Sequence, residues 1–393
     1  MPELLHELRL TKTRDEKARA SFVTGLRQHV LERMASGLRT VYLADVEPRL
    51  RHANNAAPDG AAVHRALRGH EYFQFYSALR VCAQAMLFQV VAPALERERD
   101  SLHARARALA EHAPLGSLTL RDNFELPRSV TAIDVHLMAG GYTSEYGTDD
   151  LIAGAVYDNR LAAFSMGLMG RNLDDIGQSI ANFVGVRYPQ FTPGRILDLG
   201  CTIGHNTGAW KDSFPDAEVF GIDVAAPGLR YALPRARSQG RAIHFRQMNA
   251  EALEFPEASF DVVFSSMFLH EVPRMGIARV LREAHRVLRP GGLMLHMEVP
   301  PNSKLSAYDG FYLDWDGYYN NEPYYKPFRD LDPQTIVRQA GFSPENFLEF
   351  VVPSLGALGP ERWREAVKRE HRIDDSTGRL ASGVRWYCFG AWK

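Results

Sequence analysis

The stretch Arg195–Gly204, RILDLGCTIG, decides the fold of this chain. It begins as a short apolar run, passes into a turn that contains Gly200 and Gly204, and continues as a helix from about His205. Glycines in a strand–helix turn permit positive φ angles and let a ligand approach the backbone closely. The helix N-terminus beyond the turn presents free N–H groups that suit a carboxylate or a phosphate. The stretch therefore predicts a ligand site at the end of a strand.

Short apolar runs alternate with helix-length segments after this stretch, and such alternation predicts a parallel sheet covered by helices on both faces. The expected strands are Arg195–Leu199, Glu218–Ile222, Ile243–Gln247, Asp261–Ser265 and Leu293–Met297. The expected helices are His205–Phe214, Pro227–Ser238 and Arg274–Leu288. Two later runs, Asn346–Val352 and Val384–Trp392, flank an expected helix at Glu361–Glu370 and can pair as an antiparallel edge.

An acidic residue, Asp223, follows the second expected strand. At that position a carboxylate can accept hydrogen bonds from ribose hydroxyls. A glycine turn alone is weak evidence, because it can be plain strand–helix geometry. The turn together with an acid at the next strand end indicates a nucleotide-like ligand.

The N-terminal part of the chain has a helical pattern and contains no motif that indicates a particular chemistry. Apolar residues recur at steps of three and four, which places them on one helix face: Phe22, Val23, Leu26, Val30, Met34, Leu38 and Val41. Breakers at Asn54, Asn55 and Pro58–Gly60 precede an expected long apolar helix, Val63–Val91, and a charged one, Glu96–His112. We expect a helical domain over 1–130, a helical connector that covers the ligand site over 131–190, and a ligand-binding domain over 191–393.

Composition narrows the class of protein. The chain has 393 residues, enough for two or three units at roughly 150 residues each. With 46 basic and 47 acidic residues it lacks the positive charge of a typical nucleic-acid-binding protein. The N-terminus lacks an apolar signal-peptide core, and Val81–Leu95 is too short to span a bilayer. Cys82, Cys201 and Cys388 have neither disulfide nor metal-ligand spacing, so we expect a cytoplasmic protein with no membrane contact and no metal.

Four motifs together resemble one known family. ILDLGCTIG, GID, NAEALEFPEASFDVVFSS and RVLRPGGLML, in this order, are similar to the motif series of class I S-adenosylmethionine-dependent methyltransferases. The resemblance covers about Thr192–Val299. It implies an α/β, Rossmann-like seven-stranded sheet of order 3-2-1-4-5-7-6 whose last strand is antiparallel. It also implies S-adenosyl-L-methionine as the cofactor.

The same resemblance assigns cofactor-binding residues. Gly200 and Gly204 match the glycines beside the methionine portion of the cofactor, and Asp198 matches the acid before them. Asp223 matches the acid that binds the ribose diol. Asn249 and Ala250 match the pair that meets adenine, where Asp is more usual than Asn; an Asn carbonyl still accepts a hydrogen bond. Ser265 and Ser266 face the region of methyl transfer. Thr202 departs from the family, because a β-branched residue replaces the middle glycine; its hydroxyl can still bind the cofactor carboxylate.

Three aromatic or titratable residues are candidates for catalysis. His270 follows the fourth strand, where it can accept a proton from a hydroxyl or amine acceptor with Glu271 orienting it, or can be structural. Tyr146 and Tyr157 lie in a polar, aromatic segment that resembles the helix covering the cofactor in this family. An aromatic face near a sulfonium is favoured by cation–π attraction. Either tyrosine can instead pack between the helical domain and the sheet.

An aromatic insertion, about 305–330, is the most distinctive stretch: Tyr308–Arg329 reads YDGFYLDWDGYYNNEPYYKPFR. It follows the fifth strand, at the rim of the predicted pocket. We interpret it as a lid over a small, partly apolar acceptor. The alternative is a homodimer interface, since tyrosines are also enriched at interfaces.

Three functions remain open on the sequence. The favoured one is methylation of a small-molecule acceptor in bacterial specialised metabolism. The same fold and cofactor also host enzymes that cyclise S-adenosylmethionine, as in azetidine-2-carboxylate formation, or cleave it to methylthioadenosine, because fold does not determine reaction. The third is a non-catalytic cofactor-binding or interaction protein. A nicotinamide dehydrogenase is disfavoured by the Asp198-x-Gly200 lead-in and the Asn249–Glu251 segment.

Overall fold

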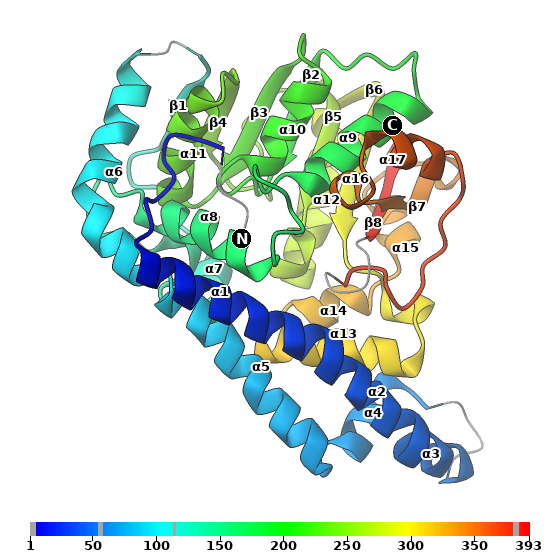
Figure 1. Cartoon of the computed structure of the whole chain (residues 1–393). Helices are drawn as coiled ribbons and strands as arrows, with labels where there is room; N and C mark the ends of the chain where they lie inside the picture. Colours follow the sequence, from blue (N-terminus) through cyan, green and yellow to red (C-terminus); the bar gives the residue numbers. More distant parts are fainter. Residues whose placement is uncertain (1–4, 54–57, 113–114, 380–384) are drawn as a thin grey trace.

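A computed structural model of the chain describes residues 5–53, 58–112, 115–379 and 385–393. Its centre is one mixed sheet of order β1-β4-β3-β2-β5-β6-β8-β7, with an α-helical block packed beneath it (Figure 1). The strands are β1 Ser117–Thr119, β2 Arg195–Leu199, β3 Glu218–Asp223, β4 Ile243–Gln247, β5 Phe260–Ser266, β6 Leu288–Glu298, β7 Phe347–Pro353 and β8 Arg385–Trp392.

The expected fold class is confirmed. Strands β2 to β8 follow the order 3-2-1-4-5-7-6, and β8 is antiparallel to both β6 and β7. The sheet nevertheless has eight strands and not seven, because β1 pairs in parallel with β4 at the far edge. A three-residue strand carries too little alternation to be recognised in a sequence. The expected start of the last strand at Val384 lies outside the described residues.

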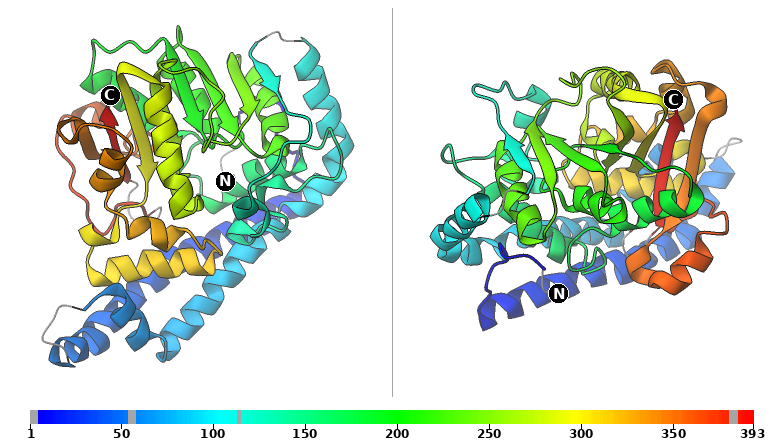
Figure 2. Two further views of the ribbon diagram at one scale, coloured as in Figure 1. Left: turned by 180° about the vertical axis from the view of Figure 1, so that it is seen from behind. Right: turned by 90° about the horizontal axis from the view of Figure 1, so that it is seen from above.

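Helices cover both faces of the sheet, as the two turned views in Figure 2 show. Successive β2 side chains point to opposite faces: Ile196 packs in one core cluster with Trp210 and Leu229, and Leu197 packs in another with Ile277 and Val280. The first face is covered by α9 Asp175–Arg187, α10 His205–Ser213 and α11 Ala226–Ser238. The second is covered by α12 Arg274–Val287.

The N-terminal block is built on a nearly continuous helical rod that begins with α1 Arg14–Gln28 and ends with α3 Glu47–Ala53 (Figure 1). The expected apolar face is buried at Val23, Val30, Met34 and Leu38, but Phe22 is exposed. Phe22 directly precedes Val23 and so lies about 100° around the helix from that buried side chain.

The expected single helix Val63–Val91 is two helices, α4 Gly60–Leu67 and α5 Glu71–Gln89. They are separated at His70, whose side chain accepts a hydrogen bond from the Tyr72 N–H and caps α5. Together with α6 Ala92–His112, α5 gives one stretch of the described residues, Glu71–Glu111, that could cross a membrane by length and composition alone. Within the fold, 44% of its most apolar window is buried.

The aromatic insertion forms α13 Ala307–Tyr319 and α14 Tyr325–Arg329. Trp315 stacks on Tyr76 of α5 with ring centroids 4.9 Å apart, and its Nε1–H donates to Ser77 Oγ over 3.1 Å. The Tyr312 and Tyr76 hydroxyl oxygens lie 3.0 Å apart. These rings are thus buried within one chain, whereas Tyr319 and Tyr324 are half-buried and Tyr318 is 74% exposed. The homodimer interface stays a prediction. The insertion joins the helical block to the sheet.

Candidate functional site

One cavity of about 630 Å³ lies between the carboxyl ends of the central strands and the helical block. Its sheet side is formed by the segments that follow β2, β3, β4 and β5, and its far side by α1, α5 and α13. Open α/β sheets bind ligands at these strand ends. Of the predicted residues, the cavity lining includes Asp198, Gly200, Thr202, Asp223, Asn249, Ala250, Tyr157 and His270. It leaves out Gly204, Ser265 and Tyr146.

The turn after β2 has the conformation that its glycines predict. Gly200 has φ +68°, and a Cβ there would overlap the ring of Phe268. Thr202 adopts φ +51°, a left-handed conformation that a β-branched residue rarely takes. Its N–H donates to Asp223 Oδ2 over 2.9 Å, and this bond holds the turn against the end of β3. Thr202 therefore adopts the backbone conformation expected of the glycine that it replaces.

Gly204 has a structural place and does not line the cavity. It is the N-cap of α10 with φ +71°, and a Cβ there would overlap the ring of Phe245. The predicted contact between Gly204 and the cofactor is not supported by this position. Its positive φ instead sets the direction in which α10 leaves the turn.

Two carboxyl groups, the buried Asp198 and the half-buried Asp223, stand at the sheet side of the cavity. Asp223 Oδ1 accepts from the Ala225 N–H over 2.9 Å, and burial raises the pKa of Asp223. Asp198 Oδ2 accepts from Thr207 Oγ1 over 2.6 Å, while burial raises the pKa of Asp198 to about 7. Asn249 Oδ1 accepts from the Glu251 N–H over 2.9 Å, so one lone pair of this oxygen remains for a ligand.

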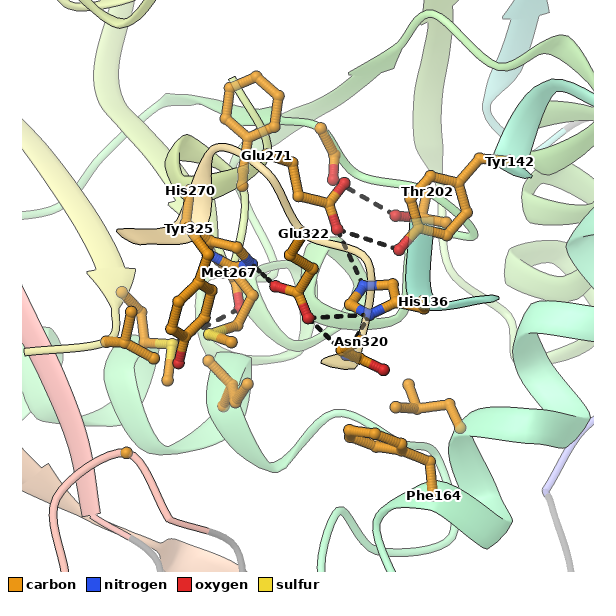
Figure 3. Close-up of a pocket in the computed structure, with 18 of the residues that line it drawn as sticks. His136, Tyr142, Phe164, Thr202, Met267, His270, Glu271, Asn320, Glu322 and Tyr325 are labelled. Atoms are coloured by element: carbon orange, nitrogen blue, oxygen red, sulfur yellow. Dashed lines mark hydrogen bonds and ion pairs between the residues drawn. The ribbon is translucent and has the colours of Figure 1, made fainter. Parts of the chain in front are cut away.

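A network of histidines and carboxylates crosses the middle of the cavity (Figure 3). Glu271 Oε1 accepts from the Tyr142 hydroxyl over 3.0 Å and lies 3.1 Å from His136 Nε2. His136 Nδ1 lies 3.2 Å from Glu322 Oε1 on the other side. Burial lowers the pKa of His136, but the negative charges of Glu322 and Glu271 outweigh it and raise the pKa overall. The His136 ring thus lies between the carboxylates of Glu271 and Glu322.

His270 is paired with a carboxylate that the sequence did not single out. Its Nδ1 lies 2.6 Å from Glu298 Oε2, at the end of β6, and its Nε2 lies 3.6 Å from Glu322 Oε2. Burial lowers the pKa of His270, but these charges outweigh it and raise the pKa to about 9. This pairing disfavours the predicted role of His270 as a proton acceptor at neutral pH, because a raised pKa favours the protonated ring. Glu271 bonds His136 and Tyr142, not His270 as expected.

Three further predicted residues have clear positions. Tyr157, on α8 Ile152–Phe164, lies in the cavity with its ring centroid 5.7 Å from that of His205. Tyr146 is 83% exposed and outside the cavity, which contradicts a role beside the cofactor. Ser265 is buried with its Oγ 2.7 Å from His296 Nδ1, because alternation in β5 turns it away and brings Ser266 to the cavity.

Sequence reasoning missed the residues that distant segments bring to the site. His136, Glu298, Asn320 and Glu322 were not predicted, and no local motif marks them. Glu322 lies among several polar residues of the aromatic insertion, and nothing in the sequence sets it apart from them. A usable signal existed for Glu298, since it directly follows the fifth expected strand, Leu293–Met297, at the ligand-binding edge.

Comparisons with known proteins agree with the fold. Residues 196–292 match the family profile of a methyltransferase domain. The fatty-acid O-methyltransferase of Mycolicibacterium smegmatis is 30% identical over 50% of this chain and 67% of its own length. The demethylmenaquinone methyltransferase of Thermus thermophilus is 37% identical over 28% of this chain and 50% of its own. The chain spans about half the length of the first curated relatives that it matches. This chain belongs to the class I S-adenosylmethionine-dependent methyltransferase family.

A solved structure is also similar. The phosphoethanolamine N-methyltransferase 2 of Haemonchus contortus, in complex with S-adenosyl-L-methionine, is 21% identical with a TM-score of 0.39, and the match covers 60% of this chain and 57% of that one.

The residues of the cavity fit S-adenosylmethionine, the cofactor of this family. The Asp223 carboxylate lines the cavity beside Thr202, where it can accept from a ribose diol. Bare backbone at Gly200 and the open side of Asn249 lie on the same wall. A cavity of about 630 Å³ lies within the range of roughly 300–1,000 Å³ typical of ligand sites.

Proposed function

We propose that this protein transfers the methyl group of S-adenosylmethionine to a small-molecule acceptor in bacterial specialised metabolism, in the cytoplasm. The observation that carries the proposal is the continuity of the cavity, which joins the cofactor-side wall at Asp223 to a second wall of α1, α5 and α13. The second wall lies outside the matched methyltransferase profile and is available to an acceptor. Relatives named for fatty-acid and malonyl-[acyl-carrier protein] methylation support an acceptor with an acyl chain.

The protein's part in the reaction is positioning. S-adenosylmethionine supplies a methyl group on a positively charged sulfur. The walls of the cavity then have to hold the acceptor atom in line with that methyl group and to keep water out. The α13 helix serves this purpose, since Tyr312 and Leu313 line the cavity on the side away from the sheet.

Glu271 and Glu322 are the proton acceptors in this proposal, in place of His270. Burial alone raises the pKa of each carboxylate, but the interactions with His136 and His270 outweigh it and hold both pKa values below their ordinary range. Both groups are therefore ionised at neutral pH, and both line the cavity. A carboxylate in this position can accept the proton that an acceptor hydroxyl or amine releases.

The test begins with binding. Calorimetric titration is expected to give binding of S-adenosylmethionine and none of NAD; the reverse would overturn the family-based assignment of the ligand. Turnover is then followed by mass spectrometry with an acceptor panel of fatty acids and other small acids, phenols and amines. Acceptor-dependent S-adenosylhomocysteine supports the proposal. Methylthioadenosine formed without an acceptor would instead indicate cyclisation or cleavage, and binding without turnover would indicate a non-catalytic protein.

A further inference from the structure

Three buried arginines on three different helices line the cavity. They are Arg27 on α1, Arg80 on α5 and Arg160 on α8, with exposures of 1%, 1% and 4%. The methyltransferase profile begins at residue 196, so all three lie outside it. None of the assigned functions uses them.

Only one of the three guanidinium groups has a carboxylate partner among the described residues. Arg80 Nε donates to Asp316 Oδ1 over 2.6 Å. Arg27 and Arg80 share the side-chain oxygen of Gln84, over 3.0 and 3.3 Å. Arg27 Nε, Arg160 Nε and Arg160 Nη1 are buried without a hydrogen-bond partner. Arg160 rests on the ring of Phe88 at 4.9 Å, and Arg27 on that of Phe164 at 4.4 Å.

This arrangement leaves an excess of positive charge in a buried wall. Three guanidinium groups face a single carboxylate, and a buried charge without a partner is unfavourable. Burial, followed by repulsion from Arg80, lowers the pKa of Arg27 well below its ordinary value. Planar N–H donors of this kind match the two oxygens of a carboxylate. The wall therefore has the chemistry of an anion site.

We propose that Arg27 and Arg160 bind a carboxylate of the acceptor, which makes the acceptor an organic acid. This inference rests on the proposed function. The cofactor has one carboxylate of its own, and even if that group reached Arg160, Arg27 would still lack an anion. The acceptor's body is apolar, because Leu31, Phe164 and Met169 line the cavity around the two arginines.

The experiment uses the full chain saturated with S-adenosylhomocysteine, so that the carboxylate of the cofactor product is already bound. Octanoate and its neutral counterpart octanamide are titrated by calorimetry into the wild-type protein, Arg27→Gln and Arg160→Gln. Arg19→Gln is the matched control, because Arg19 is exposed on the same helix as Arg27. Affinity for S-adenosylhomocysteine and the circular dichroism spectrum are measured for every variant.

We expect octanoate to bind the wild-type complex on the order of tenfold tighter than octanamide, the effect of one charged hydrogen bond. Each cavity variant should lose that preference and keep its affinity for S-adenosylhomocysteine within about threefold, and Arg19→Gln should match the wild type. Equal binding of octanoate and octanamide would overturn the inference without requiring any variant to fold. So would variants that weaken S-adenosylhomocysteine more than octanoate. Failure of the wild type to bind S-adenosylhomocysteine would overturn the proposed function as well.

Discussion

Glu298→Gln is expected to destabilise the protein and to release the proton of His270. Glu298 is fully buried and accepts from the Phe268 N–H over 2.9 Å and the Leu269 N–H over 2.6 Å, besides pairing with His270. The pKa of His270 rises from 6.5 to about 9 in the folded protein. One pKa unit corresponds to about 1.4 kcal/mol, so the rise represents about 3 kcal/mol of stability. The cost of breaking a buried ion pair, roughly 3–5 kcal/mol, agrees with it.

The sign of the pH dependence follows from the raised pKa of His270. The stabilisation is fully present below pH 6.5 and is lost as the pH rises through about 9. Urea unfolding at pH 6.5 should place Glu298→Gln about 3 kcal/mol below the wild type, and the gap should narrow toward pH 10. Glu257→Gln, at an exposed site, is the control and should change stability by less than about 0.5 kcal/mol.

NMR titration of the His270 ring provides a direct readout, since its pKa should fall in Glu298→Gln. The reasoning is refuted by a gap under about 1 kcal/mol at pH 6.5, or by a gap that does not change with pH.

Further changes test the cofactor wall and the aromatic insertion. Asp223→Ala should weaken S-adenosylmethionine by about tenfold to a hundredfold in calorimetry, because charged hydrogen bonds contribute roughly 1.5–3 kcal/mol; unchanged affinity would contradict the ribose assignment. Gly200→Ala should destabilise the fold by about 1–3 kcal/mol in urea unfolding, since the new Cβ overlaps Phe268 at a positive φ; wild-type stability would show that the turn relaxes freely. Trp315→Ala should cost roughly 3–5 kcal/mol in the same assay and Tyr318→Ala under 0.5, because only Trp315 is buried; equal losses would contradict the packing of α13.

The strands and their order were predictable because local patterns carry them. Strands β2 and β4 have the expected bounds, and the others differ by a few residues at their ends. The exception is β1, whose three residues pair only because the chain returns to the edge of the sheet beside β4. A strand this short, which forms only because it pairs with β4, shows no alternation of apolar and polar residues in the sequence.

The candidate site was predictable only in part. The residues that could be predicted lie next to recognisable motifs in the sequence, and the others come from distant segments. Asp198, Thr202 and Asp223 belong to strand ends whose neighbours in the sequence reveal their place. Tyr146 and Tyr157 occur in one aromatic segment, yet only Tyr157 reaches the cavity. Residue type and spacing could not separate them, since the direction of each side chain depends on how the segment packs.

The sequence by itself determined the family, the order of strands β2 to β8 and the candidate cofactor residues at the strand ends, since these depend on short motifs whose residues are close together in the chain. Only the tertiary structure decided the environment that raises the pKa of His270, because Glu298 reaches it from β6 and Glu322 from the loop between α13 and α14. It also decided the anion site, which three helices form by burying Arg27, Arg80 and Arg160 together. Charge–charge interactions depend on distance and burial, and both are properties of the folded chain.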